Sequence, residues 1–493
     1  MDERVSSSTI NSDATPQRVT DARTAELQRY YDALAPDRER WKQRNWYYHQ
    51  EIVRLIRFLV PPGRRVLEVG CGPGDLLDAA RPSEGVGIDL SPAMVEIARR
   101  KYSAHRFEPM DVAALDLGEK PFDYIILSDI LGDLIDVGAA LERLHVVSRP
   151  DTRIVITYYN HLWEPVLKAG ERLGVKKRQR HQSFLHLDDI ENLLHLSDWE
   201  RIRRGHHLLL PKYVPGLSHV VNRYGPLMPL VNRLSLVQWM VARPSPARGT
   251  MPGRRVSVII PCKNERGNID AAVERLPVLG DGTEIVFVDG NSDDGTVEAI
   301  DATIAAHPER EIRLIHQGDG KGKGDAVRKG FEAATGDILM ILDADLTVAP
   351  EDLPKFCSAI IAGKGDLING TRLVYPMEQQ AMRFLNFIAN KLFGVLFSWL
   401  LGQRITDTLC GTKVLYRRDY ERIKANRSHF GNFDPFGDFD LLFGAARLNM
   451  KLIDLPVRYH DRTYGDTKIS RFRHGLLLFR MCGIALKRLK LMQ

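Results

Sequence analysis

Apolar residues occur along this chain in two patterns, as short runs bounded by glycine, proline and acidic residues, and as longer stretches with apolar positions three or four residues apart. The short runs are typical of strands buried in a parallel sheet, and the longer stretches of helices packed on that sheet. In the first half these patterns predict helices between residues 22 and 60, interrupted after Pro36. Five strands are then predicted, at residues 66–69, 85–89, just before 111, 122–129 and 153–157.

The second half repeats the alternation of strand and helix. Strands are predicted at residues 256–261, 283–289, 313–316 and 338–342, and helices at 269–276, 297–305 and 326–334. Strands that alternate with helices predict a parallel sheet covered by helices. We therefore expect an α/β fold in each half, a Rossmann-like domain followed by a second open-sheet domain.

A boundary is predicted between the two halves. Residues 238–242 are expected to form an edge strand that closes the first domain, and residues 243–253 then combine three prolines with small residues, which suit neither a helix nor a sheet. The predicted organisation is a disordered polar tail at 1–21, a first domain at 22–243, a linker at 244–253 and a second domain at 254–493. Because the linker is short, the two domains are expected to share a substrate or a membrane face.

Composition narrows the functional classes. The 493 residues carry a formal net charge of +6, without the concentrated basic patch of a nucleic-acid-binding protein, so no nucleic-acid partner is expected. The five cysteines are scattered and show no CxxC spacing, which indicates reduced thiols in a cytosolic protein and no zinc site. The polar N-terminal stretch does not resemble a signal peptide.

A glycine-rich loop follows the first predicted strand. Gly70, Gly72 and Gly74 permit a tight turn and a close approach of the backbone to a ligand at the start of a helix. Asp89 ends the next strand about 20 residues later, where a carboxylate that binds a ribose is expected. A glycine pattern of this kind is a weak signal alone, and it gains weight from the strand and acid that follow it.

These residues, together with Asp111 and the strand at 122–129, resemble the class I S-adenosylmethionine-dependent methyltransferases over about residues 22–243. The resemblance implies that Glu68, Gly70, Gly72 and Gly74 line the methionine end of the cofactor. It also implies that Asp89 accepts hydrogen bonds from the ribose and that Asp111 contacts the adenine. A dinucleotide oxidoreductase is the competing interpretation, but its loop is usually GxGxxG, and Glu68 with the spacing found here favours a cofactor without phosphates.

Further residues of the first half are candidates for a lid or for the methyl acceptor, with ordinary packing or solvation as the alternative. They are Tyr30, Tyr31, Tyr48, His49, Asn160, His161 and the basic run at 176–181.

Two carboxylates follow the apolar run at 338–342. Asp343 and Asp345 are predicted to point to one side of the strand-to-loop turn, with Ala344 turned away. Open α/β sheets bind ligands at the carboxyl ends of their strands, and Mg²⁺ or Mn²⁺ could bridge these acids to a diphosphate. A solvated loop is the alternative, because Asp-x-Asp is common in loops.

The ordered set of polar strand ends in the second half resembles the family 2 glycosyltransferases of the GT-A type over about residues 254–491. The resemblance implies that Pro261 and Glu265 flank the nucleotide of a sugar donor, Asp289 recognises the base and Lys323 approaches the phosphates. Asp343 and Asp345 then correspond to the DxD motif that holds the metal. Lys263 and Thr347 depart from common residues of the family, which leaves the sugar and the base open.

Motifs further along resemble the polyprenyl- and dolichyl-phosphate branch of that family. They lie at residues 369–372, 383, 407–413, 437–440 and 462–468. The match implies that Arg372 and Arg383 grip an acceptor phosphate, with surface ion pairs as the alternative. It implies that Arg462 and Lys468 close over the donor and stabilise the leaving group, and that Asp438, or else Asp440, serves as a general base for a hydroxyl acceptor.

Two apolar stretches, 384–401 and 476–491, contain too many polar residues to be clean membrane spans. They are predicted to be interfacial helices, with core packing as the alternative. The expected protein is a cytoplasmic bifunctional enzyme, with the inner face of a membrane as the alternative location. It would transfer a sugar to a lipid phosphate or a glycan and a methyl group from S-adenosylmethionine. The alternatives are a glycosyltransferase with a non-catalytic methyltransferase-like regulatory or docking module, a soluble glycan acceptor, and a membrane-associated scaffold.

Overall fold

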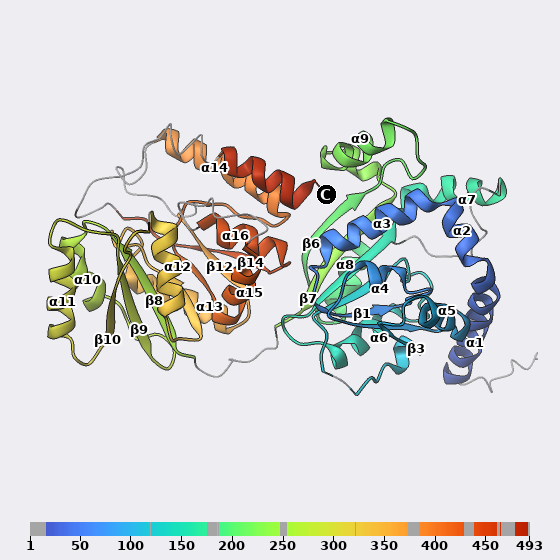
Figure 1. Cartoon of the computed structure of the whole chain (residues 1–493), viewed down its shortest axis with the longest axis horizontal. Helices are drawn as coiled ribbons and strands as arrows, with labels where there is room; N and C mark the ends of the chain where they lie inside the picture. The colour runs from blue at the N-terminus through green and yellow to red at the C-terminus, as the bar shows by residue number, and fades with distance from the viewer. Residues whose placement is uncertain are drawn as a thin grey trace, which may run out of the picture. The chain divides into compact units, whose positions relative to one another are not determined.

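A computed structural model describes residues 16–118, 120–174, 185, 187–246, 254–320, 322–372, 384–427, 438–460, 464 and 479–491. The chain divides into two compact units, Met1–Ser245 and Pro246–Gln493, which we call unit 1 and unit 2. Each unit contains one seven-stranded sheet with helices packed on it (Figure 1). The prediction of two α/β domains, each built on an open sheet, is confirmed.

Unit 1 begins with three helices, α1 (Pro16–Leu34), α2 (Arg38–Arg44) and α3 (Trp46–Leu59). The predicted interruption at Pro36 is a short 3-10 segment, η1 (Ala35–Asp37). Helix α1 begins at Pro16, so residues 16–21, predicted as part of a disordered tail, are helical. A proline is well tolerated in the first turn of a helix, where its missing N–H has no partner to lose.

The sheet of unit 1 has the order β3-β2-β1-β4-β5-β7-β6, and β1 to β5 are parallel. Most side chains of β1, β2, β4 and β5 are buried and apolar, which explains the short apolar runs in the sequence, whereas only Phe107 is buried in β3. The strands are β1 (Arg65–Val69), β2 (Glu84–Asp89), β3 (Arg106–Pro109), β4 (Tyr124–Ser128), β5 (Arg153–Tyr159), β6 (Trp199–His207) and β7 (Val237–Pro244).

The expectation that residues 238–242 form an edge strand was wrong. Strand β7 lies inside the sheet, antiparallel to both β5 and β6. Strand β6 comes earlier in the chain and covers the outer side of β7, so β6 is the edge. The helices that follow α3 in this unit are α4 (Asp75–Ala79), α5 (Pro92–Lys101), α6 (Val137–Arg143), α7 (Glu164–Arg172), α8 (Leu187–Leu196) and α9 (Leu217–Tyr224).

The sheet of unit 2 has the order β10-β9-β8-β11-β13-β12-β14. Its first four members form the parallel half, as predicted, with β8 and β11 side by side at the centre. Strand β13 is antiparallel to both β11 and β12. The strands are β8 (Val256–Cys262), β9 (Thr283–Asp289), β10 (Glu311–His316), β11 (Ile338–Ile341), β12 (Leu367–Thr371), β13 (Lys413–Tyr416) and β14 (Leu452–Pro456).

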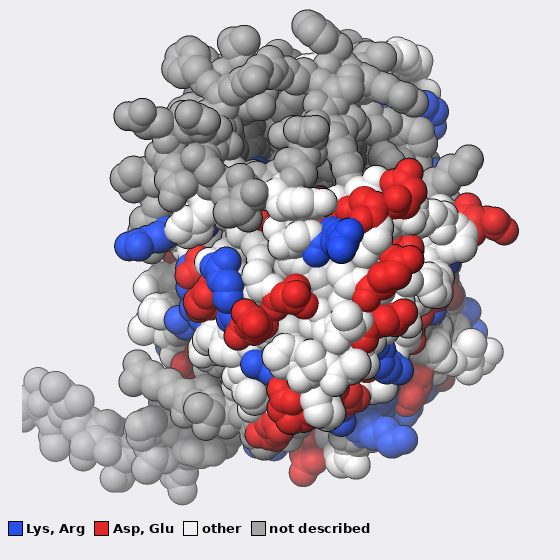
Figure 2. Space-filling model, turned by 90° about the vertical axis from the view of Figure 1, so that its left-hand side faces the viewer, with Lys and Arg blue, Asp and Glu red and all other residues white. Residues whose placement is uncertain are grey.

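Helices cover the sheet of unit 2 (Figure 1). They are α10 (Ile269–Glu274), α11 (Thr296–Ala306), α12 (Lys323–Ala333), α13 (Leu353–Ile361), α14 (Phe384–Leu401), α15 (Arg417–Ala425) and α16 (Asp438–Arg447). Figure 2 shows one side of the chain, the side where α10 and α11 lie, and acidic and basic side chains are interspersed on it.

Core packing, the alternative interpretation of the 384–401 stretch, holds for part of helix α14, and contact with a membrane surface stays a prediction. Phe397 and Leu401 are fully buried in the core, while Leu392 and Val395 are exposed. The segment at 479–491 likewise buries side chains against the same core. Within the described residues, every helix is too short or too polar to cross a bilayer.

Candidate active sites

In unit 1 the glycine-rich loop connects β1 to α4 in a backbone conformation that requires glycine. Gly70, Gly72 and Gly74 have φ values of +69°, +49° and +82°, in the left-handed region that residues with a Cβ rarely adopt. A Cβ at Gly70 would also overlap the side chain of Ile130. Because these three residues have no side chains, the backbone of the loop stays uncovered toward the space above the sheet.

Two predicted carboxylates hold this loop in place. Asp89, at the end of β2, accepts hydrogen bonds from the backbone N–H groups of Gly72 and Ser91, both at 2.8 Å. Glu68 lies in β1 and accepts one from Leu77 N–H at 2.9 Å. Burial raises the pKa of both carboxyl groups, that of Glu68 well above its usual range. Both acids are thus fixed in position by backbone donors.

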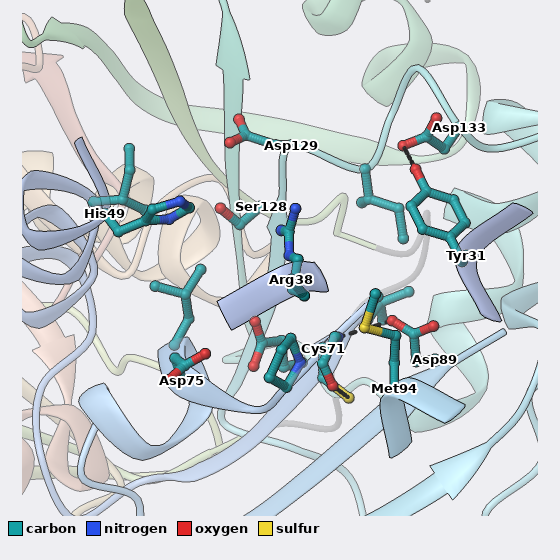
Figure 3. Close-up of a pocket in the computed structure, with 18 of the residues that line it drawn as sticks. Tyr31, Arg38, His49, Cys71, Asp75, Asp89, Met94, Ser128, Asp129 and Asp133 are labelled. Atoms are coloured by element: carbon teal, nitrogen blue, oxygen red, sulfur yellow. Dashed lines mark hydrogen bonds between the residues drawn. The ribbon is translucent and has the colours of Figure 1, made fainter. Parts of the chain in front are cut away.

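A cavity of about 1010 Å³ opens above the loop. The predicted residues Glu68, Gly70, Gly72, Asp89 and Asp111 line it, whereas Gly74 does not. In Figure 3, Asp89 lies beside Met94, and His49, Ser128 and Asp129 lie on the other side of the pocket. Asp111 also accepts a hydrogen bond from Ala113 N–H at 3.0 Å and so caps the 3-10 segment η2 (Val112–Ala114).

Two tyrosine–aspartate pairs join the N-terminal helices to the wall of this cavity. The Tyr48 hydroxyl donates to Asp129 Oδ2 at 2.5 Å. The Tyr31 hydroxyl donates to Asp133 Oδ2 at 2.6 Å, as Figure 3 shows. Burial and the adjacent carboxylate raise the pKa of each tyrosine. Both tyrosines were predicted from the sequence and both acids were not, although Asp129 ends a predicted strand in the way that Asp89 does.

His49 also lines the cavity. Burial, assisted by the charges of Arg38 and Lys42, lowers the pKa of His49 to about 3. The imidazole is therefore neutral at physiological pH, when one of its nitrogens can accept a proton or a hydrogen bond.

Asn160 has a structural role. Its Oδ1 accepts from Leu162 N–H, and its Nδ2 donates to the carbonyl oxygens of Arg233 and Ser235 at 2.8 and 2.9 Å. Neither Asn160 nor His161 lines the cavity. The basic run at 176–181 lies outside the described residues.

In unit 2, an ion pair occupies the corner where β11 ends. Lys323 Nζ, in the first turn of α12, lies 2.6 Å from Asp343 Oδ1. Burial opposes ionisation of Asp343, but Lys323 and the nearby charges of Lys413 and Arg372 outweigh burial and lower the pKa of Asp343. A Cβ at Gly411 would overlap both the carboxylate and the ammonium, so the loop before β13 passes close to this pair.

The other predicted donor-site acids are held by short loops. Asp345 Oδ1 accepts from the hydroxyl and the N–H of Thr347, at 2.8 and 3.2 Å. Asp289 is buried at the end of β9 and accepts from the backbone of residues 291 and 292. Glu265 follows β8, of which Pro261 is a member, and accepts from Asn268 Nδ2 at 2.8 Å.

Arg372 forms a buried pair with Asp407. Its Nε and Nη2 donate to the two carboxylate oxygens at 2.7 and 2.9 Å, and its backbone N–H donates to the same acid at 3.1 Å. This bidentate pair raises the pKa of the guanidinium, although burial opposes the charge. Asp407 was not considered as a partner of Arg372 in the sequence analysis.

Several expected acceptor-site residues cannot be compared with the structure. Arg383, Arg462 and Lys468 lie outside the described residues, and so does the side chain of Asp438. Asp440, the other candidate base, pairs with Arg427 Nε at 2.8 Å. Among the described residues, no group of three or more His, Cys, Asp or Glu side chains is arranged so that it could hold a metal ion.

Each unit contains a region that matches a protein-family model. The model named "Glycosyl transferase family 2" matches residues 257–423, and a "Methyltransferase domain" model matches residues 40–203. The first range contains β8 to β13 and the Lys323–Asp343 pair, and the second contains the glycine loop and Asp89.

Three curated proteins illustrate the similarity. Glycosyltransferase AglD of Haloferax volcanii is 29% identical over 46% of this chain and 36% of its own length. Polyprenol monophosphomannose synthase of Mycolicibacterium smegmatis is 29% identical over 44% of this chain and 82% of its own. Dolichol-phosphate mannosyltransferase of Pyrococcus furiosus is 38% identical over 44% of this chain and 59% of its own. The similarity thus spans less than two thirds of two of these relatives.

Proposed function

We propose that this chain, which contains a methyltransferase domain at residues 40–203 and a family 2 glycosyltransferase domain at residues 257–423, is a bifunctional enzyme. Unit 2 transfers a sugar from a nucleotide-sugar to a polyprenyl-phosphate acceptor with inversion. Unit 1 transfers a methyl group from S-adenosylmethionine to a lipid or glycan acceptor.

The observation that carries the sugar-transfer proposal is the corner formed by Lys323 and Asp343. It places a positive charge at the N-terminus of α12, where a diphosphate is favoured by both the ammonium and the helix dipole. Mg²⁺ and Mn²⁺ commonly bind through one or two protein carboxylates plus the phosphates of the substrate. Asp343 and Asp345 fit this partial ligand set, and a metal held there would stabilise the departing diphosphate.

The acceptor is proposed from the relatives, two of which are named for polyprenol or dolichol phosphate mannose transfer. A phosphate acceptor is already anionic and needs no general base. Because Asp440 is paired with Arg427 and Arg372 with Asp407, we assign the grip on the acceptor phosphate to Arg383 and give Arg372 a supporting role. Arg462 and Lys468 are proposed to close over the donor, Glu265 and Asp289 to hold its nucleoside, and Asp438 to act only on a hydroxyl acceptor.

A donor screen tests the sugar transfer. The full chain is incubated with labelled UDP- and GDP-sugars and Mn²⁺, with and without polyprenyl phosphate, and label is counted in the organic phase. We expect organic-phase label that requires both the metal and the lipid phosphate. Label transferred equally well to soluble glycans would replace the lipid acceptor, and the absence of both transfer and donor hydrolysis would refute the assignment.

The methyl-transfer proposal is supported by the size of the cavity in unit 1. Its volume of about 1010 Å³ is at the upper end for a small-molecule site, so it offers space for S-adenosylmethionine and part of an acceptor. Methyl transfer needs mainly alignment and exclusion of water. The tyrosine–aspartate pairs of α1 and α3 form one wall of such an enclosure.

A non-catalytic methyltransferase-like module is the second candidate. Calorimetry with S-adenosylmethionine separates the two: binding that Asp89→Ala removes, followed by turnover with lipid or glycan acceptors, supports the enzyme. Binding without turnover across those acceptors would favour the module.

Contact of α14 and the segment at 479–491 with a membrane surface is a further part of the proposal, supported by the exposed Leu392, Val395 and Phe479.

A further inference from the structure

Helix α9 of unit 1 exposes apolar side chains and buries polar ones. Leu217, Val220 and Tyr224 are 51%, 53% and 50% exposed, and their spacing places them on one face of the helix. Ser218 and Asn222 are buried on the opposite face. A helix at a water-exposed surface normally has the reverse arrangement.

The buried polar face is fixed by hydrogen bonds, so this orientation is built into the fold. Asn222 Oδ1 accepts from the N–H groups of Leu209 and Leu210, both at 2.8 Å, and Asn222 Nδ2 donates to Tyr47 Oη at 3.1 Å. Ser218 Oγ accepts from Val214 N–H at 2.7 Å. Rotating the helix to hide its leucine and valine would break all of these bonds.

The apolar surface continues on both sides of the helix. We call it the α9 face and define it by eight exposed residues: Tyr213, Val214, Leu217, Val220, Tyr224, Met228, Leu230 and Leu234. Leu230 is the most exposed of them, at 73%, and lies at the turn between η5 (Gly225–Leu227) and η6 (Val231–Leu234). Exposed apolar residues gathered in one segment of this kind favour a site of interaction.

The segment that forms this face carries charges of one sign. Between Glu200 and Glu265 the sequence contains neither Asp nor Glu, while Lys212, Arg223 and Arg233 lie within the segment that forms the α9 face. A segment that combines exposed apolar side chains with cations and has no acids of its own matches a bilayer that contains anionic phospholipid, because acyl chains accept the apolar side chains and head groups attract the cations.

We propose that the α9 face docks unit 1 onto an anionic membrane surface. The segment begins and ends beside the cavity, since Pro211, Lys212 and Leu236 line it, and Trp163 Nε1 donates to the Leu234 carbonyl at 2.8 Å. Docking therefore holds the cavity close to the head groups. If the proposed methyl transfer is correct, its acceptor belongs to the lipid-linked class.

The test uses the full chain and a single introduced thiol. All five native cysteines are buried, so L230C can be labelled selectively with a polarity-sensitive fluorophore. With vesicles of phosphatidylglycerol and phosphatidylcholine we expect a blue shift, quenching by lipids that carry a nitroxide, and loss of both at high salt. The control is L196C on α8, where Leu196 is exposed at 68% outside the α9 face; its label is expected to stay in water.

The second measurement is co-sedimentation with the same vesicles. Replacing Leu217, Val220, Leu230 and Leu234 together by serine is expected to lower the bound fraction at least about threefold, whereas serine at the exposed Val146, Leu173, Leu196 and Val278 is expected to leave it unchanged. If the protein sedimented with vesicles while the fluorophore on L230C stayed in water, the proposal would be overturned, because another surface of the protein would then bind the vesicles. A label at 230 that is shielded before vesicles are added would overturn it too, in favour of a protein covering. Neither readout requires sugar or methyl transfer.

Discussion

At the scale of single residues, Asp343 shows how a partly buried acid is kept ionised. The Lys323 ammonium at 2.6 Å offsets the cost of burial, and Gly411 leaves room for both groups. A metal and a diphosphate entering this corner would find an existing charge pair, so the carboxylate does not have to lose a proton first.

We predict that Asp345→Asn lowers sugar transfer by about 10²-fold or more, the cost of removing one charge-stabilising group from an active site. Asp301→Asn, which removes an exposed carboxylate from α11, is the matched control and is expected to keep full activity. Initial rates at saturating donor and several Mn²⁺ concentrations measure the effect. Equal rates for both variants would remove Asp345 from the site.

The buried pair of Arg372 and Asp407 permits a double-mutant cycle. Removing one partner leaves a buried charge unpaired, so Arg372→Ala is expected to destabilise unit 2 by about 3–5 kcal/mol. The double variant with Asp407→Ala is expected to be less destabilised than the sum of the two single changes. Urea unfolding measures all four proteins, and strict additivity would show that the two side chains are not coupled.

His49 predicts a dependence of stability on pH. The pKa of His49 is about 3 in the folded chain and 6.5 in its ordinary state. Between pH 3 and pH 6.5 the imidazole is therefore protonated in the unfolded chain and neutral in the folded chain. The contribution of neutral His49 to the free energy of unfolding is complete above pH 6.5 and is lost as the pH falls toward 3. We expect the melting temperature of unit 1 to fall less between pH 7 and pH 5 in His49→Gln than in the wild type. His195→Gln, an exposed histidine on α8, should follow the wild type.

At the scale of elements, helix α12 approaches the sheet closely because it contains Gly330. A Cβ there would overlap Ile259 of β8. Gly330→Ala is therefore expected to destabilise unit 2 by about 1–3 kcal/mol through overpacking.

The matched control is Gly483→Ala. Gly483 lies in a helical segment with open space where a Cβ would be placed, so alanine is expected to be neutral or to stabilise by up to about 1 kcal/mol. Opposite signs of the two changes in the same denaturation assay would show that contact with the sheet, and not helix propensity, decides the effect.

Apolar pattern located the strands β1 to β5 and β8 to β11, most of which are buried on two faces, because such a strand leaves an uninterrupted run of apolar residues. It did not locate β12, β13 or β14, whose inward residues include Asn369, Thr371 and Lys413. Their polarity is satisfied by partners distant in sequence, such as Asp454, which accepts from Asn369. The pair of Arg372 and Asp407 was not predicted for the same reason. The sequence gives the type of each residue but does not show which distant residue it contacts.

At the scale of the whole molecule, two compact units with separate sheets predict two unfolding transitions. S-adenosylmethionine is expected to raise the melting temperature of one transition, and a nucleoside diphosphate with Mn²⁺ that of the other, since a ligand stabilises only the unit that binds it. Differential scanning calorimetry of the full chain measures both. A single transition shifted by either ligand would mean that the two units unfold together.

The segment that joins the units leaves from β7 and enters β8, and each of these strands has a hydrogen-bonded neighbour on both sides. A force applied through this joining segment therefore acts on two rows of hydrogen bonds at each end. It does not peel an edge strand away from its sheet. Pulling the two units apart should therefore leave both sheets intact at forces that would remove an edge strand, which makes the connection a mechanically robust one.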